Sequence, residues 1–87
     1  MFTIVLPNQA IHSIDPLSEC QNLMILNLSR NCIENLSPLK KCKELKIVNL
    51  SDNSISQAND LGGCKHLVNL QLQKNHIRAF EHIKALK

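Results

Sequence analysis

The chain has 87 residues, of which 44% are hydrophobic and 20% are charged, and its formal net charge is +3. This length allows one domain at most, and the composition is that of an ordinary soluble chain. No apolar run approaches the about 20 residues that a membrane helix needs, so we expect no contact with a membrane.

The first apolar segment, residues 2–6, alternates as a strand does. It is too short for the core of a signal peptide and lacks the basic start. With no export signal, we expect a cytoplasmic protein, with the nucleus left open.

One apolar pattern then recurs at an interval of 22 residues. The pattern Leu-x-x-Leu-x-Leu-x-x-Asn-x-Ile begins at Leu23, and it returns with minor changes at Leu45 and Leu67. An incomplete copy around Ile4 opens the chain. A fixed period in the range of 20–29 residues is typical of a solenoid. The sequence therefore predicts one array over 1–87, with a partial repeat at 1–22 and repeats at 23–44, 45–66 and 67–87. Both ends lack a polar cap, so we expect a fragment of a longer chain.

Within each repeat the central segment predicts a strand, and successive strands should pair in parallel. The inward side chains are expected to be Ile4, Leu6, Leu26, Leu28, Val48, Leu50, Leu70 and Leu72. Asn31, Asn53 and Asn75 follow the strands, where an amide can both donate to and accept from the backbone of adjacent repeats. Gln9 occupies this slot in the first turn, and its longer side chain should bond the backbone less well.

Return segments between the strands should form short helices or 3₁₀ turns on the opposite, convex face. They are 13–22, 35–44, 57–66 and 79–87. Pro16 and Pro38 fall near the first turn of such a helix, where a missing N–H costs little. Asn59-Asp60 offers capping side chains in the third segment, and Gly62-Gly63 should make that segment the weakest.

Three of the four cysteines occupy one slot of the repeat. Cys20, Cys42 and Cys64 follow one another at intervals of 22 residues, which favours small interior side chains. The close Cys pairs typical of structural zinc sites are missing from the sequence, so we expect no metal and no cofactor. Cys32 lies outside this column at a more exposed position, either as a neutral residue or as a redox-sensitive thiol.

The pattern resembles the 22-residue class of leucine-rich repeats. The consensus positions are matched by Ile14, Leu17, Cys20, Leu23, Leu26, Leu28, Asn31 and Ile33 and by their copies. The resemblance implies an α/β fold, a leucine-rich-repeat solenoid with a parallel sheet on its concave face. The class is similar to regulatory subunits of protein phosphatase 1, to axonemal and ciliary proteins, and to a spliceosomal protein that pairs with an RNA-binding partner. It implies a protein that holds another macromolecule.

The outward strand positions form the candidate partner-binding face. They are Val5, Ile25, Asn27, Ser29, Ile47, Asn49, Ser51, Asn69, Gln71 and Gln73, with Thr3 and Pro7 completing the first strand. Val5, Ile25 and Ile47 should make an apolar patch rimmed by polar groups, which suggests docking, although β-branched residues are also simply good strand formers. The Asn-x-Ser triplets beginning at Asn27, Asn35 and Asn49 match glycosylation sequons, and the repeat consensus explains them.

Lysines at positions 40, 41, 43 and 46 cluster in the second and third repeats and could steer an acidic partner. They are not interleaved with aromatic residues, so we expect no direct nucleic-acid binding. The histidines occupy unrelated slots, and no Gly-rich phosphate loop is present, so we expect no enzyme activity.

Two functional hypotheses follow. The first is a non-catalytic protein–protein interaction scaffold within a large intracellular assembly, with the ciliary axoneme as its setting. The second is a regulatory or adaptor subunit that docks a phosphatase or an RNA-binding partner.

Overall fold

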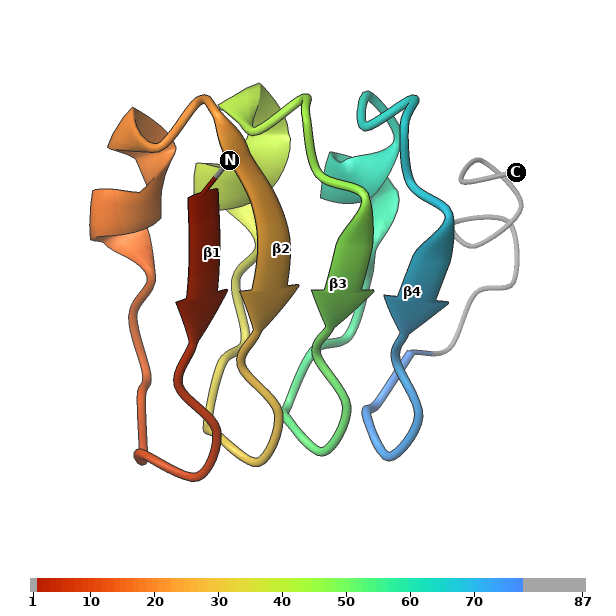
Figure 1. Cartoon of the computed structure of the whole chain (residues 1–87). Coiled ribbons are helices and arrows are strands. Elements are labelled where there is room, and N and C mark those ends of the chain that lie inside the picture. The colour runs from red at the N-terminus through yellow and green to blue at the C-terminus, as the bar shows by residue number, and fades with distance from the viewer. Residues whose placement is uncertain (1, 78–87) are drawn as a thin grey trace.

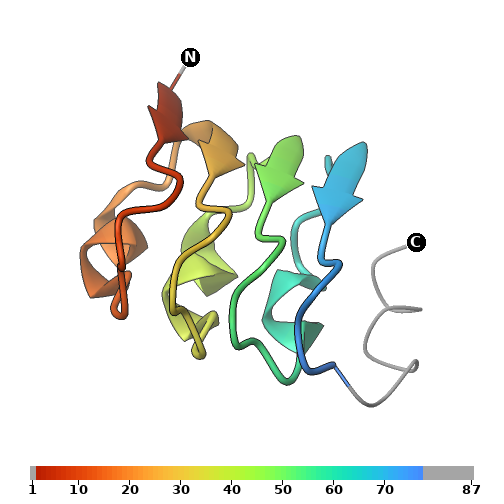
Figure 2. The same cartoon turned by 90° about the horizontal axis from the view of Figure 1, so that it is seen from below.

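The structure of the chain is a computed structural model that describes residues 2–77. It is a stack of similar turns, with the strands on one side and the 3₁₀ turns on the other (Figures 1 and 2). In chain order the elements are β1 (Phe2–Val5), η1 (Asp15–Glu19), β2 (Leu23–Asn27), η2 (Ser37–Lys41), β3 (Ile47–Asn49), η3 (Asn59–Leu61) and β4 (Asn69–Gln71). The fourth return segment, 79–87, lies outside the described residues. No helix within residues 2–77 is long and apolar enough to cross a membrane.

The strands form one sheet in the order β1-β2-β3-β4, and each neighbouring pair is parallel. Ile25 pairs with Ile47, and Ile47 pairs with Asn69. Each partner is thus 22 residues further along the chain, which is the interval of the sequence pattern. Among the four described strands, the register shifts between Phe2 and Thr3, at the start of β1.

The core is a continuous column of aliphatic side chains that runs from turn to turn. Leu26 and Val48, at equivalent positions of β2 and β3, are both 0% exposed. Burying a side chain of this size contributes about 1.5–3 kcal/mol. The inward positions predicted for these two strands are confirmed, because Leu28 and Leu50 are also buried.

The turns opposite the sheet are 3₁₀ rather than α-helical. The N–H of Leu39 donates to the carbonyl oxygen of Leu36 at 2.9 Å, and the N–H of Cys42 donates to that of Leu39 at 3.0 Å. Side chains three residues apart eclipse one another in this geometry. An apolar residue at every third position therefore places the whole series on the core. As expected beside Gly62, η3 is the shortest of the turns in the described residues.

The expected capping of η3 by Asn59 and Asp60 is wrong. The N-cap residue is Ala58, which makes no side-chain cap hydrogen bond. Asp60 instead pairs with Lys40, at 3.6 Å between Oδ1 and Nζ. Before η2 a side chain does bond the start of the turn: Oδ1 of Asn35 accepts from the N–H of Ser37, the first residue of η2, at 3.0 Å.

Asparagine side chains complete the backbone hydrogen bonds where the chain leaves the sheet. Oδ1 of Asn31 accepts from the N–H groups of Gln9 and Ile11, each at 2.9 Å, and Nδ2 donates to the Leu6 oxygen at 3.0 Å. The same group also donates to Leu28 within its own turn at 2.8 Å. These bonds join adjacent repeats, as predicted.

Gln9, in the equivalent slot of the first turn, makes a weaker version of this arrangement. Its Nε2 donates to the Pro7 oxygen at 3.2 Å in an exposed position. This bond corresponds to the weakest of the Asn31 bonds, the one to Ser29 at 3.2 Å. The longer amide thus reaches less of the backbone than asparagine does.

Candidate partner-binding face

The predicted site residues lie together on the open face of the sheet, in three rows that cross the strands. The strand register defines the first two rows. The third row lies just beyond the strands, where the pairing continues: the Arg30 N–H donates to the Ser51 oxygen at 3.0 Å, which places Ser29 beside Ser51. We name them the apolar row (Thr3, Ile25, Ile47, Asn69), the amide row (Val5, Asn27, Asn49, Gln71) and the hydroxyl row (Pro7, Ser29, Ser51, Gln73).

The apolar patch differs from the expected one in the place of Val5. Ile25 and Ile47 are direct neighbours, but Val5 pairs with Asn27, and Thr3 lies beside Ile25. Val5 is therefore diagonal to Ile25, about 7–8 Å away in a sheet. The register explains this, because a side chain two residues further along a strand falls in the next row.

Exposure makes this apolar pair available to a partner. Ile47 is 41% exposed and Val5 is 54% exposed, while Ile25 is half-buried. Isoleucine that faces solvent in the middle of a sheet contributes little to the core, so its contact area is free for another molecule.

The amide row is held rigidly by the serines that follow it. Oδ1 of Asn27 accepts from the backbone N–H of Ser29 at 3.1 Å and from its hydroxyl at 2.9 Å. Oδ1 of Asn49 accepts from the N–H and the hydroxyl of Ser51 at 3.1 and 2.7 Å. Sequence reasoning missed these bonds. Their signal was the Asn-x-Ser spacing, which places the two side chains on the same face of a strand.

The face carries no charge within the described residues, and the charged groups stand at its edge. Arg30, Asp52 and Lys74 follow the hydroxyl row, and all three are exposed. Their φ angles are 59°, 59° and 61°, in the left-handed region. This conformation turns the chain sharply away from the sheet, and it is unusual for residues other than glycine, asparagine and aspartate. Asn8 has the same conformation in the first turn, with φ of 58°.

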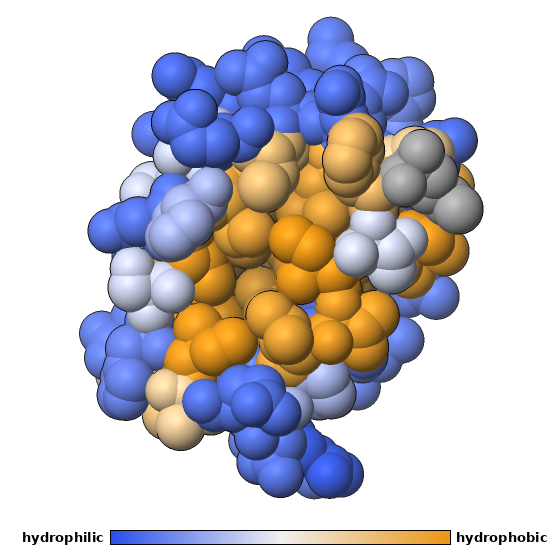
Figure 3. Space-filling model, turned by 60° about the vertical axis from the view of Figure 1, so that its left-hand side comes forward, coloured by the Kyte–Doolittle hydropathy of each residue, from blue (hydrophilic) through white to orange (hydrophobic). Residues whose placement is uncertain are grey.

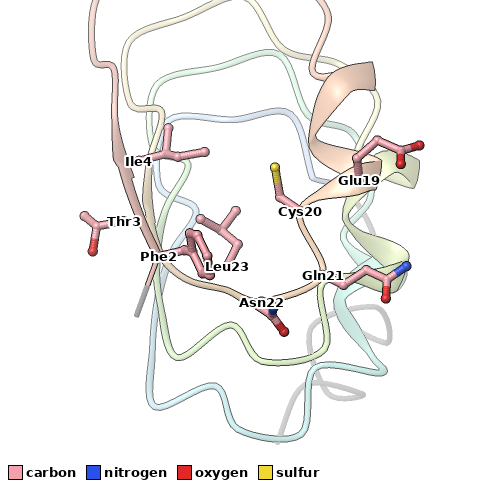
Figure 4. Close-up of a pocket in the computed structure, with 8 residues that line it drawn as sticks. All are labelled: Phe2, Thr3, Ile4, Glu19, Cys20, Gln21, Asn22 and Leu23. Atoms are coloured by element: carbon pink, nitrogen blue, oxygen red, sulfur yellow. The ribbon is translucent and has the colours of Figure 1, made fainter.

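A second surface lies at the N-terminal end of the stack, where the core is open. Figure 3 shows hydrophobic side chains gathered at the centre of this end with hydrophilic ones around them. A hollow of about 220 Å³ lies between β1 and the segment after η1. In Figure 4, Ile4, Cys20 and Leu23 point into this interior, whereas Thr3 points away from it. Phe2 and Leu6 are 58% and 46% exposed.

The cysteine column is interior, as predicted, at two of its three positions. Cys42 and Cys64 are buried, and Cys20 is half-buried at the open end. Sγ of Cys42 lies 3.3 Å from the Leu17 oxygen. Burial raises the pKa of the Cys42 thiol, and the neighbouring Cys20 and Cys64 raise it further. Burial also raises the pKa of Cys64, although Lys43 lowers it. Residues 2–77 contain no group of three or more His, Cys, Asp or Glu side chains that could hold a metal.

The lysines of the predicted basic cluster, at positions 40, 41, 43 and 46, are all exposed. Lys43 and Lys65 occupy the same slot of successive turns, outside the sheet face. Lys40 forms an ion pair with Asp60. Lys46 lies directly before β3, and its backbone N–H donates to the Met24 oxygen at 2.8 Å. We therefore take the sheet face as the candidate site.

The fold is a leucine-rich-repeat solenoid, with the sheet on the concave face. Neither a protein-family model nor a curated protein matches the sequence. Solved structures do match. An internalin (inlF) from Listeria monocytogenes superposes over 99% of this chain with a TM-score of 0.93 and 26% identity.

Two further structures show the same architecture. Internalin C2 (inlC2) from Listeria monocytogenes superposes over 88% of the chain, with a TM-score of 0.84 and 28% identity. The plant peptide hormone receptor RGFR1, in complex with RGF2, superposes over 99% with a TM-score of 0.79. Its 21% identity bears on the fold alone. The chain spans 25%, 34% and 15% of the three matched chains.

Proposed function

We propose that this chain is a non-catalytic protein-binding module and that the concave sheet face binds the partner. The observation that carries the proposal is the Ile25–Ile47 pair, in which Ile47 is exposed and Ile25 half-buried, on a face without charged side chains within the described residues. A partly exposed apolar pair that is rimmed by ordered polar groups is the anatomy of a protein interface. RGFR1, whose structure shares this fold, was solved in complex with RGF2.

The proposal extends to the setting. We favour a scaffold of the 22-residue class of leucine-rich repeats within a large intracellular assembly such as the ciliary axoneme. A regulatory subunit that docks a phosphatase or an RNA-binding protein is the alternative. Four free cysteines support a reducing, intracellular compartment.

The test is a double variant, Ile25→Glu with Ile47→Glu, that places two carboxylates on the exposed pair. Neither side chain is part of the buried core, so the fold should persist, as measured by circular dichroism. Capture of the partner by the intact chain from a cell extract, quantified by mass spectrometry, should fall by about tenfold or more because two charges would be desolvated in the interface.

The matched control is Ser56→Glu with Gln57→Glu. Both residues are exposed, lie outside the sheet face and give the same change of charge, and Glu34 is the natural residue in the slot of Ser56. The control should capture the partner as the wild type does. Equal capture by the folded Ile25/Ile47 variant would remove the concave face from the proposal. Tubulin or dynein components among the lost proteins would support the first setting, and a phosphatase or spliceosomal protein would support the second.

A further inference from the structure

The amide row presents hydrogen-bond donors to the solvent, and the backbone sets this polarity. A backbone N–H can only donate, so the Asn27 atom that faces the Ser29 N–H must be the oxygen, Oδ1. The same holds for Asn49 and Ser51. Each Nδ2 is therefore turned away from the chain, and it has no acceptor within residues 2–77.

The two donors stand side by side. Asn27 and Asn49 are direct partners in the register of β2 and β3, and neighbouring strands lie about 4.8 Å apart. A carboxylate has two oxygens that only accept, so one carboxylate can accept from both Nδ2 groups at once. An extended peptide backbone that crosses the strands is a poorer match, because its carbonyl groups on one side recur about every 6.6 Å.

The surroundings also favour a carboxylate. The sheet face itself carries no charged side chain in the described part of the chain, and Arg30 lies beside Ser29 at its edge, although Asp52 lies beside Ser51. The whole chain has a net charge of +3. Two residues before the donors, the same strands present Ile25 and Ile47, about 6.6 Å away along the strand.

We infer that the concave face binds a partner segment that lays one Asp or Glu carboxylate across Asn27 and Asn49 and an adjacent apolar side chain on Ile25 and Ile47. The inference rests on the proposed function and names the chemistry of its partner. Charge-assisted hydrogen bonds supply the specificity for the acid, and burial of the neighbouring apolar side chain on the isoleucine pair supplies contact area.

The test is the isosteric double variant Asn27→Asp with Asn49→Asp. An aspartate oxygen still accepts from the serine N–H and hydroxyl, so the local structure remains, but the outward atom changes from a donor to a charged acceptor. Asn35→Asp with Asn59→Asp is the matched control. Asn35 makes the same bond to a following serine N–H, and both residues are exposed and outside the face.

The probe is a displayed library of random twelve-residue peptides, selected on the full wild-type chain. Selected peptides should contain an acidic residue next to an apolar one. Synthetic versions should bind the Asn27/Asn49 variant about tenfold or more weakly, as expected for loss of a charge-assisted hydrogen bond. Replacing the peptide's own Asp or Glu by Asn or Gln should weaken binding similarly, and the control variant should bind within about twofold of the wild type.

Other outcomes would overturn the inference. A basic consensus among the selected peptides, or tighter binding of the peptides to the Asn27/Asn49 variant, would mean that the face recognises hydrogen-bond donors of the partner rather than acceptors. Unchanged binding by that variant, or a library that yields no peptide, would equally count against it. These results leave the proposed function intact as long as the Ile25/Ile47 variant loses its captured partner. Selected peptides that bind the Ile25/Ile47 variant as well as the wild type would contradict both.

Discussion

The side chain of Asn53 donates to the backbone oxygen of Leu28, at 3.0 Å, across 25 residues of sequence. The same Nδ2 donates to Leu50 in its own turn at 3.0 Å, and Oδ1 accepts from the Ile33 N–H at 3.0 Å. Asn53 is only 6% exposed, so water cannot replace these bonds. One amide therefore completes the backbone of two turns at the point where they leave the sheet.

Replacing Asn53 with alanine should lower the free energy of unfolding by about 2–4 kcal/mol, since buried backbone groups lose their partners. Urea denaturation followed by circular dichroism measures this change. Gln9→Ala is the control and should change stability by no more than about 0.5 kcal/mol, because Gln9 makes a single exposed bond. Similar losses in the two variants would show that the amide bonds are not the stabilising feature.

Arg30→Asn should stabilise the chain by about 0.5 kcal/mol, because asparagine tolerates the left-handed backbone that Arg30 adopts, with φ of 59°. Asp52→Asn should change stability little, since aspartate already tolerates this conformation. Arg30→Val should destabilise, because a β-branched residue fits the conformation worst. Thermal or urea unfolding of the three variants checks the order, and a stabilised valine variant would contradict the backbone explanation.

The buried thiols predict a loss of stability at alkaline pH. An unfolded thiol titrates near pH 8.5, whereas burial raises the pKa values of Cys42 and Cys64 in the fold. Between these values the unfolded chain has lost a proton that the folded chain keeps. Stability is therefore fully present below about pH 8.5 and falls as the pH rises toward the folded-state values, by at most about 1.4 kcal/mol per pH unit for each thiol.

The measurement is the free energy of unfolding from pH 7 to pH 9.5 in the presence of a reductant. Cys42→Ala with Cys64→Ala should be less stable at pH 7 because of the cavities, yet show a flatter dependence on pH. If the free energy of unfolding depended on pH equally in this variant and in the wild type, the buried thiols would not be the cause. Thiol labelling gives an independent check, because Cys32 is half-buried and should react before Cys42.

The ion pair between Lys40 and Asp60 should contribute little. The Lys40 side chain is 65% exposed and the atoms are 3.6 Å apart, so Lys40→Ala should change the free energy of unfolding by no more than about 0.5 kcal/mol. A salt titration of the wild type should show a correspondingly small effect. A loss of several kcal/mol would mean that Lys40 supports the turn in another way.

The periodicity of the sequence was sufficient to predict the parallel register, the inward positions of β2 and β3 and the asparagine bonds, whereas Leu6, also predicted to point inward, is 46% exposed at the open end of the stack. These features depend on side-chain chemistry repeated at one interval, as in Leu26 and Val48. The 3₁₀ form of the convex turns was an open alternative to a helix. It follows from apolar residues at every third position, such as Leu36 and Leu39.

Other features depend on local geometry that the pattern does not specify. The left-handed conformation of Arg30 has no glycine to signal it, since the requirement comes from the shape of the turn. The cap of η3 was misassigned because the turn begins at Asn59, so that Ala58 occupies the N-cap position and Asn59 and Asp60 lie within the turn. The Asn27–Ser29 bonds were missed because the Asn-x-Ser triplet was interpreted only as a match to a glycosylation sequon.

In the part of the chain that the structure describes, each turn packs on the turns before and after it, since the sheet order is β1-β2-β3-β4. Within residues 2–77, no segment distant in sequence packs across an outer turn. Melting can therefore begin at β1, whose outer edge has no strand beside it in the described residues, and travel inward coil by coil. Amide protons at β3, which has a strand on both sides, should exchange with deuterium more slowly than those at β1. The binding residues of β2 and β3 would then stay in place when β1 separates from the sheet.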